Sequence, residues 1–313
     1  MYYYQYLIAG MRILCRIPFP VVIQEEAENF LFPVKKDGYI SGRYEDAIVT
    51  LAPAGSLPEI PESAVARADR YYSVSEKSES WIKRYQVHYC PCPGKPPYAC
   101  ALWDSGENDR LVITCLYLPG NEFRFSHSRM ISDHIGMETF FIWKSCLMLH
   151  ASFIRHQEKG ILFTAPSGTG KSTQAELWKM YEDAEILNGD RAAVRKSGGH
   201  WYAYGLPYAG SSGIYRNESA RLSAVVVLRQ AKENRIRRMK LLEIIQNLYP
   251  ETTIHHWESD FVEKALTILT ELAKEVPFYL LECRPDREAV QLLKEMLSRN
   301  DTRKPMKRET SLK

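Results

Sequence analysis

Short hydrophobic runs in the first third of the chain are typical of β-strands. A run rich in aromatic and β-forming residues covers residues 2–15 and ends before Pro18 and Pro20. Similar runs occur at residues 47–51, 81–90 and 111–118. Three prolines between residues 53 and 67 indicate a loop or the start of a short helix there. The pattern predicts a strand-rich domain over residues 1–130, with its aromatic side chains in the core.

The hydrophobic spacing changes after residue 132. Apolar positions between residues 132 and 149 follow a helical pattern, which predicts a helix that leads into a second domain. These positions are Ile135, Phe140, Phe141, Ile142, Cys146, Leu147 and Leu149. A strand at residues 148–154, a polar turn at 155–160 and a strand at 160–164 then predict a β-hairpin.

Strand and helix patterns mix in the rest of the chain. We expect a helix after residue 170 to about Tyr181, and strands at residues 184–187, 201–204, 224–228 and 278–281. Two further helices each have one apolar face, made of Phe261, Ala265, Ile268, Leu269 and Leu272, and of Ala289, Leu292, Leu293 and Met296. The predicted fold class is α/β, in an α+β mixture, with a mixed sheet over residues 131–299. The basic tail, residues 300–313, has no apolar face and is expected to be disordered.

Composition narrows the classes of partner. The chain has 313 residues, enough for two domains, and a net charge of +3. Its basic residues are dispersed, so we expect no nucleic-acid partner. No apolar run approaches the roughly 18 residues that a membrane span needs, and no signal-peptide pattern precedes the first strand. A cytoplasmic protein without a membrane partner is therefore expected.

Seven cysteines, an odd number in a long chain, favour reduced thiols. Cys90, Cys92 and Cys100 raise the alternative of a zinc site, although no second pair of ligands accompanies them. Prolines at 91, 93, 96 and 97 favour a turn between strands instead. The sequence leaves metal binding by these cysteines open.

A glycine-rich turn at residues 161–173, with the sequence ILFTAPSGTGKST, has the pattern of a phosphate-binding loop. In such a loop, backbone N–H groups and a helix N-terminus bind the phosphates, a lysine reaches the β- and γ-phosphates, and a hydroxyl ligates Mg²⁺. Ala165 replaces the first glycine of the general pattern, and a chance match in a Gly/Ser-rich connection is the alternative. The predicted nucleotide-binding residues are Ser167, Gly168, Thr169, Gly170, Lys171, Ser172 and Thr173, with Ser172 on the metal.

Three further residues are candidates for chemistry. Asp190 follows the next strand and is placed to hold Mg²⁺, with a helix-cap or turn aspartate as the alternative. His150 lies on the strand that leads through the hairpin to the loop, so we expect it to hydrogen-bond a γ-phosphate or the acceptor, although a lone histidine is more often a core residue. Arg216 follows the Gly/Ser-rich loop 205–213 and is assigned to charge stabilisation, with a plain surface loop as the alternative.

The combination of His150-Ala151-Ser152 on a strand, a hairpin, the loop 165–173 and the acidic turn at Asp190 resembles the catalytic domain of HPr kinase/phosphorylase. The same core is similar to the nucleotide site of ATP-dependent phosphoenolpyruvate carboxykinase. The resemblance covers about residues 145–298. The first 120 residues resemble at most the poorly characterised HPr-kinase-like proteins encoded beside peptide-tailoring genes.

This resemblance implies a P-loop kinase in which ATP binds the loop, and Ser172 and an aspartate organise Mg²⁺. It also implies a second, adjacent aspartate as the base for an acceptor serine, and it favours a homo-oligomer. This chain has Gly189 at that adjacent position. Either Asp190 serves both roles, or His150 assists, or the acceptor is positioned without a strong base. Phosphoryl transfer depends mainly on positioning and charge neutralisation, so the loss of one carboxylate need not abolish activity, but it leaves the base unassigned.

The expected function is therefore an ATP- and Mg²⁺-dependent kinase that transfers the γ-phosphoryl group to a serine of a protein or peptide, such as a tailored peptide precursor. The catalytic residues would be Asp190, His150, Lys171 and Arg216, with Ser172 and Asp190 on the metal. A small-molecule kinase, a carboxykinase-like lyase and a non-catalytic nucleotide-sensing module remain as alternatives. The sequence does not decide the acceptor, reverse phosphorylase activity, or the role of the first domain.

Overall fold

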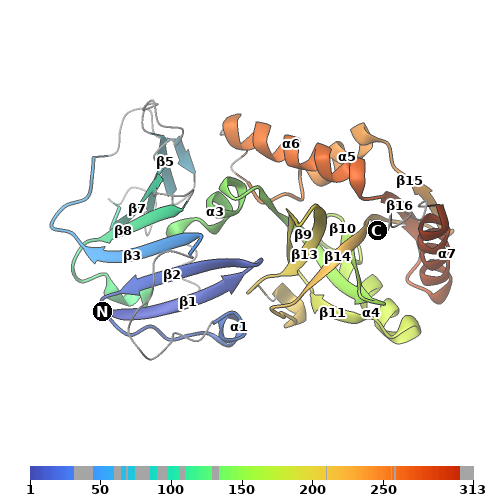
Figure 1. The fold of residues 1–313 in the computed structure, drawn as a ribbon, viewed down its shortest axis with the longest axis horizontal. Helices are drawn as coiled ribbons and strands as arrows, with labels where there is room; N and C mark the ends of the chain where they lie inside the picture. The colour runs from blue at the N-terminus through green and yellow to red at the C-terminus, as the bar shows by residue number, and fades with distance from the viewer. Residues whose placement is uncertain are drawn as a thin grey trace, which may run out of the picture. The chain divides into compact units, whose positions relative to one another are not determined.

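The chain forms two compact units. The computed structural model describes residues 1–31, 45–59, 65–67, 70–74, 85–89, 97–105, 110–128, 134–208, 210–254, 256 and 259–303. Unit 1 is Met1–Phe141 and unit 2 is Ile142–Lys313. The sequence predicts a boundary between residues 130 and 131, somewhat earlier in the chain. Figure 1 shows the elements of both units, which are described separately here.

Unit 1 contains a mixed sheet of eight strands in the order β1-β2-β3-β8-β7-β6-β5-β4. The pairs β2–β3 and β3–β8 are parallel and the other neighbours are antiparallel. Alternate residues of β8 are buried, as expected for a strand with one face on a core. The strands are β1 (Tyr2–Ile8), β2 (Met11–Ile17), β3 (Ala47–Pro53), β4 (Val65–Arg67), β5 (Arg70–Val74), β6 (Tyr85–Tyr89), β7 (Ala99–Ser105) and β8 (Leu111–Tyr117).

The helical elements of this region are short. They are α1 (Glu25–Glu28), the 3₁₀ helix η2 (Glu122–Phe125) and α3 (Met137–Trp143). The predicted helix over residues 132–149 is therefore wrong in its second half. Ser145 has a left-handed backbone, with φ of 52°, and Cys146 begins a strand. A continuous buried run fits a helix and a strand equally well, so its hydrophobic pattern could not separate them.

Unit 2 is built on a second mixed sheet, with β10-β9-β12-β13-β14-β16-β15 in order. Strand β11 also pairs with β9, and β10 also pairs with β14, so β9, β12, β13, β14 and β10 form a closed circuit of pairings. The strands are β9 (Cys146–His156), β10 (Lys159–Thr164), β11 (Glu185–Asn188), β12 (Arg191–Ser197), β13 (His200–Gly205), β14 (Ser219–Gln230), β15 (Arg235–Arg238) and β16 (Phe278–Cys283).

The predicted hairpin is formed by β9 and β10, which pair antiparallel. Its turn residues Gln157 and Glu158 both have positive φ, at 47° and 62°. Positive φ at both central positions matches the right-handed twist of the flanking strands. The hairpin therefore delivers the end of β10 to the level of Ala151 in β9, where the glycine-rich turn begins.

Helices cover both faces of these strands. They are α4 (Lys171–Glu182), η3 (Gly210–Ser212), α5 (Leu241–Leu248), α6 (Ser259–Glu275) and α7 (Arg287–Arg303). Alternate residues of β10, β14 and β16 join α4 and α7 in one hydrophobic cluster, and the intervening residues are buried too. Figure 1 shows α5 and α6 on one side of β9 and β10 and α4 on the other. Burial on both faces explains the continuous apolar runs of the central strands.

Three sequence predictions concern particular segments. Helix α7 continues to Arg303, so the start of the expected disordered tail is helical, and residues 304–313 lie outside the described residues. Cys90 and Cys92 also lie outside them, whereas Cys100 is a buried thiol whose pKa burial raises to about 11. The five cysteines of the described part are free. Within that part, no helix is both long and apolar enough to cross a membrane.

Candidate functional site

The glycine-rich turn connects the buried end of β10 to the first residue of α4. Gly168 and Gly170 have φ of 78° and 118°, a backbone region that other residues rarely adopt. Ala165 is 1% exposed and is not among the residues with positive φ. An alanine therefore suits this position, which packs in the core and does not need a glycine. Gln230, at the end of β14, donates to the carbonyl oxygens of Gly168 and Thr169 at 3.4 and 3.3 Å.

Lys171 is the charged group of this turn, and it is 7% exposed. Its Nζ donates to the carbonyl oxygens of Ala165 at 2.7 Å and Pro166 at 3.4 Å. Burial lowers its pKa, whereas the negative charges of Glu251 and Asp190 act to raise it. The ammonium group is thus held against the turn, within electrostatic reach of two carboxylates that come from distant parts of the chain.

Strand β9 brings these carboxylates together because different segments flank its two edges. On one edge, the N–H of His150 donates to Glu251 O at 2.8 Å, and the hydroxyl of Thr164 donates to His150 O at 3.0 Å. On the other edge, the N–H of Ala151 donates to Asp190 O at 2.9 Å. Three segments therefore contact β9 at His150 and Ala151: the end of β10, the segment that contains Glu251, and the residue before β12.

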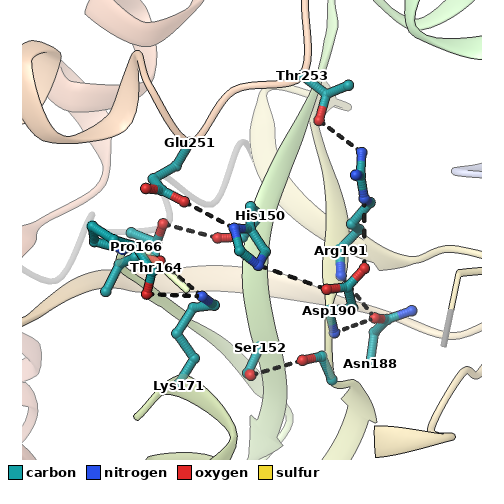
Figure 2. Close-up of polar contacts among 12 residues, drawn as sticks. His150, Ser152, Thr164, Pro166, Lys171, Asn188, Asp190, Arg191, Glu251 and Thr253 are labelled. Atoms are coloured by element: carbon teal, nitrogen blue, oxygen red, sulfur yellow. Dashed lines mark hydrogen bonds and ion pairs between the residues drawn. The ribbon is translucent and has the colours of Figure 1, made fainter. Parts of the chain in front are cut away.

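The His150 side chain lies between the two carboxylates, as Figure 2 shows. Its Nδ1 is 2.9 Å from Glu251 Oε2, and its Nε2 is 3.6 Å from Asp190 Oδ1. The first distance is a hydrogen bond and the second is too long for one. A carboxylate only accepts, so Nδ1 carries the proton in the bond to Glu251 and Nε2 faces Asp190.

Asp190 is held by the turn that precedes β12. Asn188 is fully buried, and its Oδ1 accepts the N–H groups of Asp190 and Arg191, both at 2.9 Å. The amide group of the same side chain donates to Leu206 O at 2.8 Å. This Asx-type turn fixes the backbone while the Asp190 side chain stays 30% exposed. Asp190 does not cap a helix, because the turn leads into strand β12; the alternative of a turn aspartate stays open.

The loop between β13 and β14 packs against this turn. A Cβ atom on Gly189 would overlap the side chain of Ser212, and a Cβ atom on Gly210 would lie 2.6 Å from Asp190 Cβ and 2.7 Å from its Cγ. Gly189 also donates to Ile214 O at 3.3 Å. Ser212 therefore fills the space that a side chain at position 189 would need.

The structure does not bring Arg216 to the other candidate residues. Its guanidinium binds Glu185 at 3.1 Å and lies 3.8 Å from Glu218, and the side chain is 48% exposed. The arginine beside Asp190 is Arg191, whose Nε is 3.5 Å from Asp190 Oδ2 and whose Nη1 donates to Thr253 at 2.9 Å. Among the described contacts, Arg216 takes part in an ion-pair cluster with Arg155 rather than in the site around Lys171.

The other residues that the sequence predicts to bind the nucleotide are at least partly exposed to solvent. Ser167, Gly168, Ser172 and Thr173 are exposed, and Thr169 and Gly170 are partly exposed. In the described part of the chain, no group of three His, Cys, Asp or Glu side chains is arranged to hold a metal ion. Mg²⁺ that is bound with a nucleotide takes only one or two protein ligands, the phosphates and water supplying the rest. One carboxylate and one hydroxyl, from Asp190 and Ser172, fit that chemistry.

Several residues of the site carry no signal in the sequence. Glu251, in the segment after α5, has a side chain that is 10% exposed and faces His150. Arg191 and Ser212 are adjacent to Asp190 and Gly189 in space, and neither belongs to a recognisable motif. Glu251 lies between Pro250 and Thr252, and nothing in the surrounding sequence marks it as a site residue.

Comparisons with known proteins provide little beyond this geometry. No protein-family model and no curated protein matches the chain. One solved structure that is similar to the chain is described as the HPr(Ser) kinase/phosphatase from Coxiella burnetii, with 16% sequence identity and a TM-score of 0.29. The match covers 50% of this chain and 90% of the other chain. It shows a weak structural relationship.

Proposed function

We propose that this protein is an ATP- and Mg²⁺-dependent kinase that transfers the γ-phosphoryl group to a hydroxyl. The observation that carries the proposal is the position of Lys171. It lies in a glycine-rich turn at a strand–helix junction, within electrostatic reach of Asp190 and Glu251, and these carboxylates flank His150. Charge neutralisation and positioning are the main requirements of phosphoryl transfer.

The turn would bind the triphosphate. Backbone N–H groups of residues 167–173 and the N-terminus of α4 provide the anion site, and Lys171 would leave its carbonyl partners to contact the β- and γ-phosphates. Ser172 and Asp190 would hold Mg²⁺, which supplies charge neutralisation when it is bound. The negative phosphates would also offset the cost of burying the ammonium group.

Proton transfer would involve His150. The acceptor oxygen attacks the γ-phosphorus, the bond from that phosphorus to the bridging oxygen of ADP breaks, and the hydroxyl proton passes to Nε2. Glu251 would fix this tautomer by accepting the Nδ1 proton, because the two atoms are 2.9 Å apart. Ser212 leaves no room for a second carboxylate at position 189, which favours His150 as the assisting base beside Asp190.

A serine in a protein or peptide is the acceptor that we favour, and a peptide precursor that undergoes tailoring is one such partner. Asp190 remains 30% exposed, which leaves it accessible to a bulky acceptor. Arg216 is not needed for this scheme, since Arg191 lies closer to Asp190. A homo-oligomer in the cytoplasm remains part of the proposal.

The Lys171→Ala variant tests the nucleotide site. Removal of a cation that contacts both phosphates should weaken Mg²⁺–ATP binding at least about 100-fold, or about 2.7 kcal/mol. Isothermal titration calorimetry measures this loss, with circular dichroism as the check on folding and Lys179→Ala, on the same helix, as the matched control. Near-normal binding by folded Lys171→Ala protein would remove Lys171 from the site.

Incubation with γ-labelled ATP and candidate acceptors tests the reaction class. Label on a serine of a protein or peptide is the expected result, and label on a small hydroxyl compound would instead indicate a small-molecule kinase. Binding without turnover for every acceptor and for water would support the nucleotide-sensing alternative, which the glycine at position 189 favours. Transfer of the label to a small carboxylic acid that releases CO2 in the same step would support the lyase.

A further inference from the structure

A cavity lies in unit 2, at the opposite end of β10 from the glycine-rich turn. Its volume is about 530 Å³, and β9, β10, α4, β14 and α7 contribute to its lining. Lys159 lies at the cavity end of β10 and Thr164 at the turn end. The two residues are five positions apart along the strand, which corresponds to about 16 Å. The cavity is therefore a different place from the proposed nucleotide site.

Four cationic side chains line this cavity: Lys159, Arg221, Arg238 and Lys294. Lys159 and Arg221 are register partners on the parallel strands β10 and β14, so their side chains start from neighbouring positions. Arg238 ends β15, and Lys294 comes from α7. The elements β10, β14, β15 and α7 thus each place one cationic side chain in the lining of this cavity.

The acidic groups near the cavity do not balance this charge. Glu275 is the carboxylate in the lining, and it forms an ion pair with Lys196, outside the lining. Lys294 pairs with Glu182 at 2.5 Å, and Arg221 contacts His200 at 3.0 Å. No ion pair to Arg238 is found among the described residues. Charge is therefore in excess around Arg221 and Arg238.

The histidine in the lining, His156, has a lowered pKa. Burial lowers the pKa of His156; Lys294 and Lys159 lower it further, and Glu182 opposes them. The ring packs edge-on against Trp178, with 5.2 Å between centroids. Burial is thus the main cause of the lowered pKa, and two of the four cations of the lining contribute to it.

Part of the cavity lining is apolar. Ile161, Leu222, Pro277 and Trp178 contribute to the lining. Trp178 is fully buried, and within the described part of the chain its indole N–H has no hydrogen-bond partner. Buried indole N–H groups usually find a partner, but those of Trp103 and Trp201 are unpaired as well, so this feature is shared with tryptophans outside the cavity.

We propose that this cavity binds a small molecule that carries a phosphate or pyrophosphate group on a flat or apolar body. Guanidinium groups bind phosphate oxygens in pairs, which Arg221 and Arg238 would do, with Lys159 adding charge. The apolar part of the lining would contact the body of the ligand. A volume of about 530 Å³ is within the range of small-molecule sites.

Fluorine NMR of protein labelled with 5-fluorotryptophan tests this site, with inorganic pyrophosphate as the probe. The chain has six tryptophans, and Trp178→Phe assigns the signal of Trp178. We expect pyrophosphate to shift that signal in a saturable way. Arg221→Gln/Arg238→Gln protein should need at least tenfold more pyrophosphate, whereas Arg229→Gln/Arg284→Gln, with two exposed arginines outside the lining, should respond like the parent protein.

Pyrophosphate can also bind the glycine-rich turn, so the titration is repeated in Lys171→Ala protein, where the Trp178 shift should persist. A shift that disappears with Lys171→Ala but survives Arg221→Gln/Arg238→Gln would place the ligand at the turn and overturn the proposal. An unmoved Trp178 signal in folded parent protein would overturn it as well. The single variant Arg238→Gln changes only an exposed side chain. If this variant loses the response of the Trp178 signal to pyrophosphate, the loss cannot be attributed to unfolding.

Discussion

The two contacts of His150 have different consequences. Glu251 accepts a hydrogen bond from Nδ1, while Asp190 only approaches Nε2. Glu251 should therefore orient the imidazole without contacting the substrate, as carboxylates behind histidines do in metal sites. Under the proposed function, its loss would affect the proton-transfer step more than nucleotide binding.

We expect Glu251→Gln to lower the transfer rate about 10- to 100-fold, the usual cost of removing a partner that orients a histidine. The affinity for Mg²⁺–ATP should change much less, and the pH dependence of the rate should shift. Labelled-phosphate release to an acceptor or to water measures the rate, with Glu282→Gln as the control. An unchanged rate and pH profile would mean that Glu251 only stabilises the fold.

Gly189 is restricted by its neighbour rather than by its backbone. Gly189→Asp should destabilise the protein by about 1–3 kcal/mol, because the new side chain overlaps Ser212. Thermal unfolding should show recovery in Gly189→Asp/Ser212→Gly, where the nearest remaining atom is the Cα of residue 212 at 3.9 Å. Gly189→Asp/Ser212→Ala keeps the overlapping Cβ and should show no recovery. Equal melting temperatures for all three variants would contradict this packing.

Helix α5 positions the segment that contains Glu251, and its first turn depends on Glu243. The hydrogen bond from Arg237 and that from the N–H of Lys240 lower the pKa of Glu243 from 4.5 to about 2. A lowered pKa in the folded state stabilises the protein above pH 4.5, and this contribution is lost as the pH falls toward 2. The carboxylate is thus a local cap for the helix before the site.

Glu243→Gln should lower the melting temperature at pH 6 to 7, and the difference from the parent protein should disappear as the pH falls from 4.5 to about 2. Melting curves followed by circular dichroism at several pH values measure this convergence. Glu263→Gln, on the exposed face of α6, is the control and should show no such pH-dependent difference. Parallel curves for Glu243→Gln and the parent would contradict the cap.

Every residue of the proposed nucleotide site belongs to unit 2, and that unit has its own hydrophobic cluster. A fragment of residues 142–303 should therefore fold and bind Mg²⁺–ATP within about tenfold of the full chain, a difference of about 1.4 kcal/mol. Calorimetry measures this affinity. Transfer to a protein or peptide acceptor should fall more strongly if unit 1 recognises the acceptor. A folded fragment without nucleotide binding would show that the site needs unit 1.

The sequence by itself determined the local features of this protein. Glycines at 168 and 170 lie where positive φ is required, the β9–β10 hairpin follows from two apolar runs around a polar turn, and short-range patterns place α4, α6 and most strands. These features depend on residues that are close together in the chain, so spacing and residue type suffice. Hydrophobic pattern failed at residues 146–149, where a buried strand and a helix look alike.

Only the tertiary structure decided which distant residues meet. Glu251 and Asp190 reach His150 because their segments flank opposite edges of β9, and Ser212 fills the space beside Gly189 because the β13–β14 loop folds back on the turn. Arg216 is adjacent to that loop in sequence, yet it is directed to Glu185 and Glu218. Such contacts join residues that are 23 to 101 positions apart in the chain, for which the local pattern carries no signal.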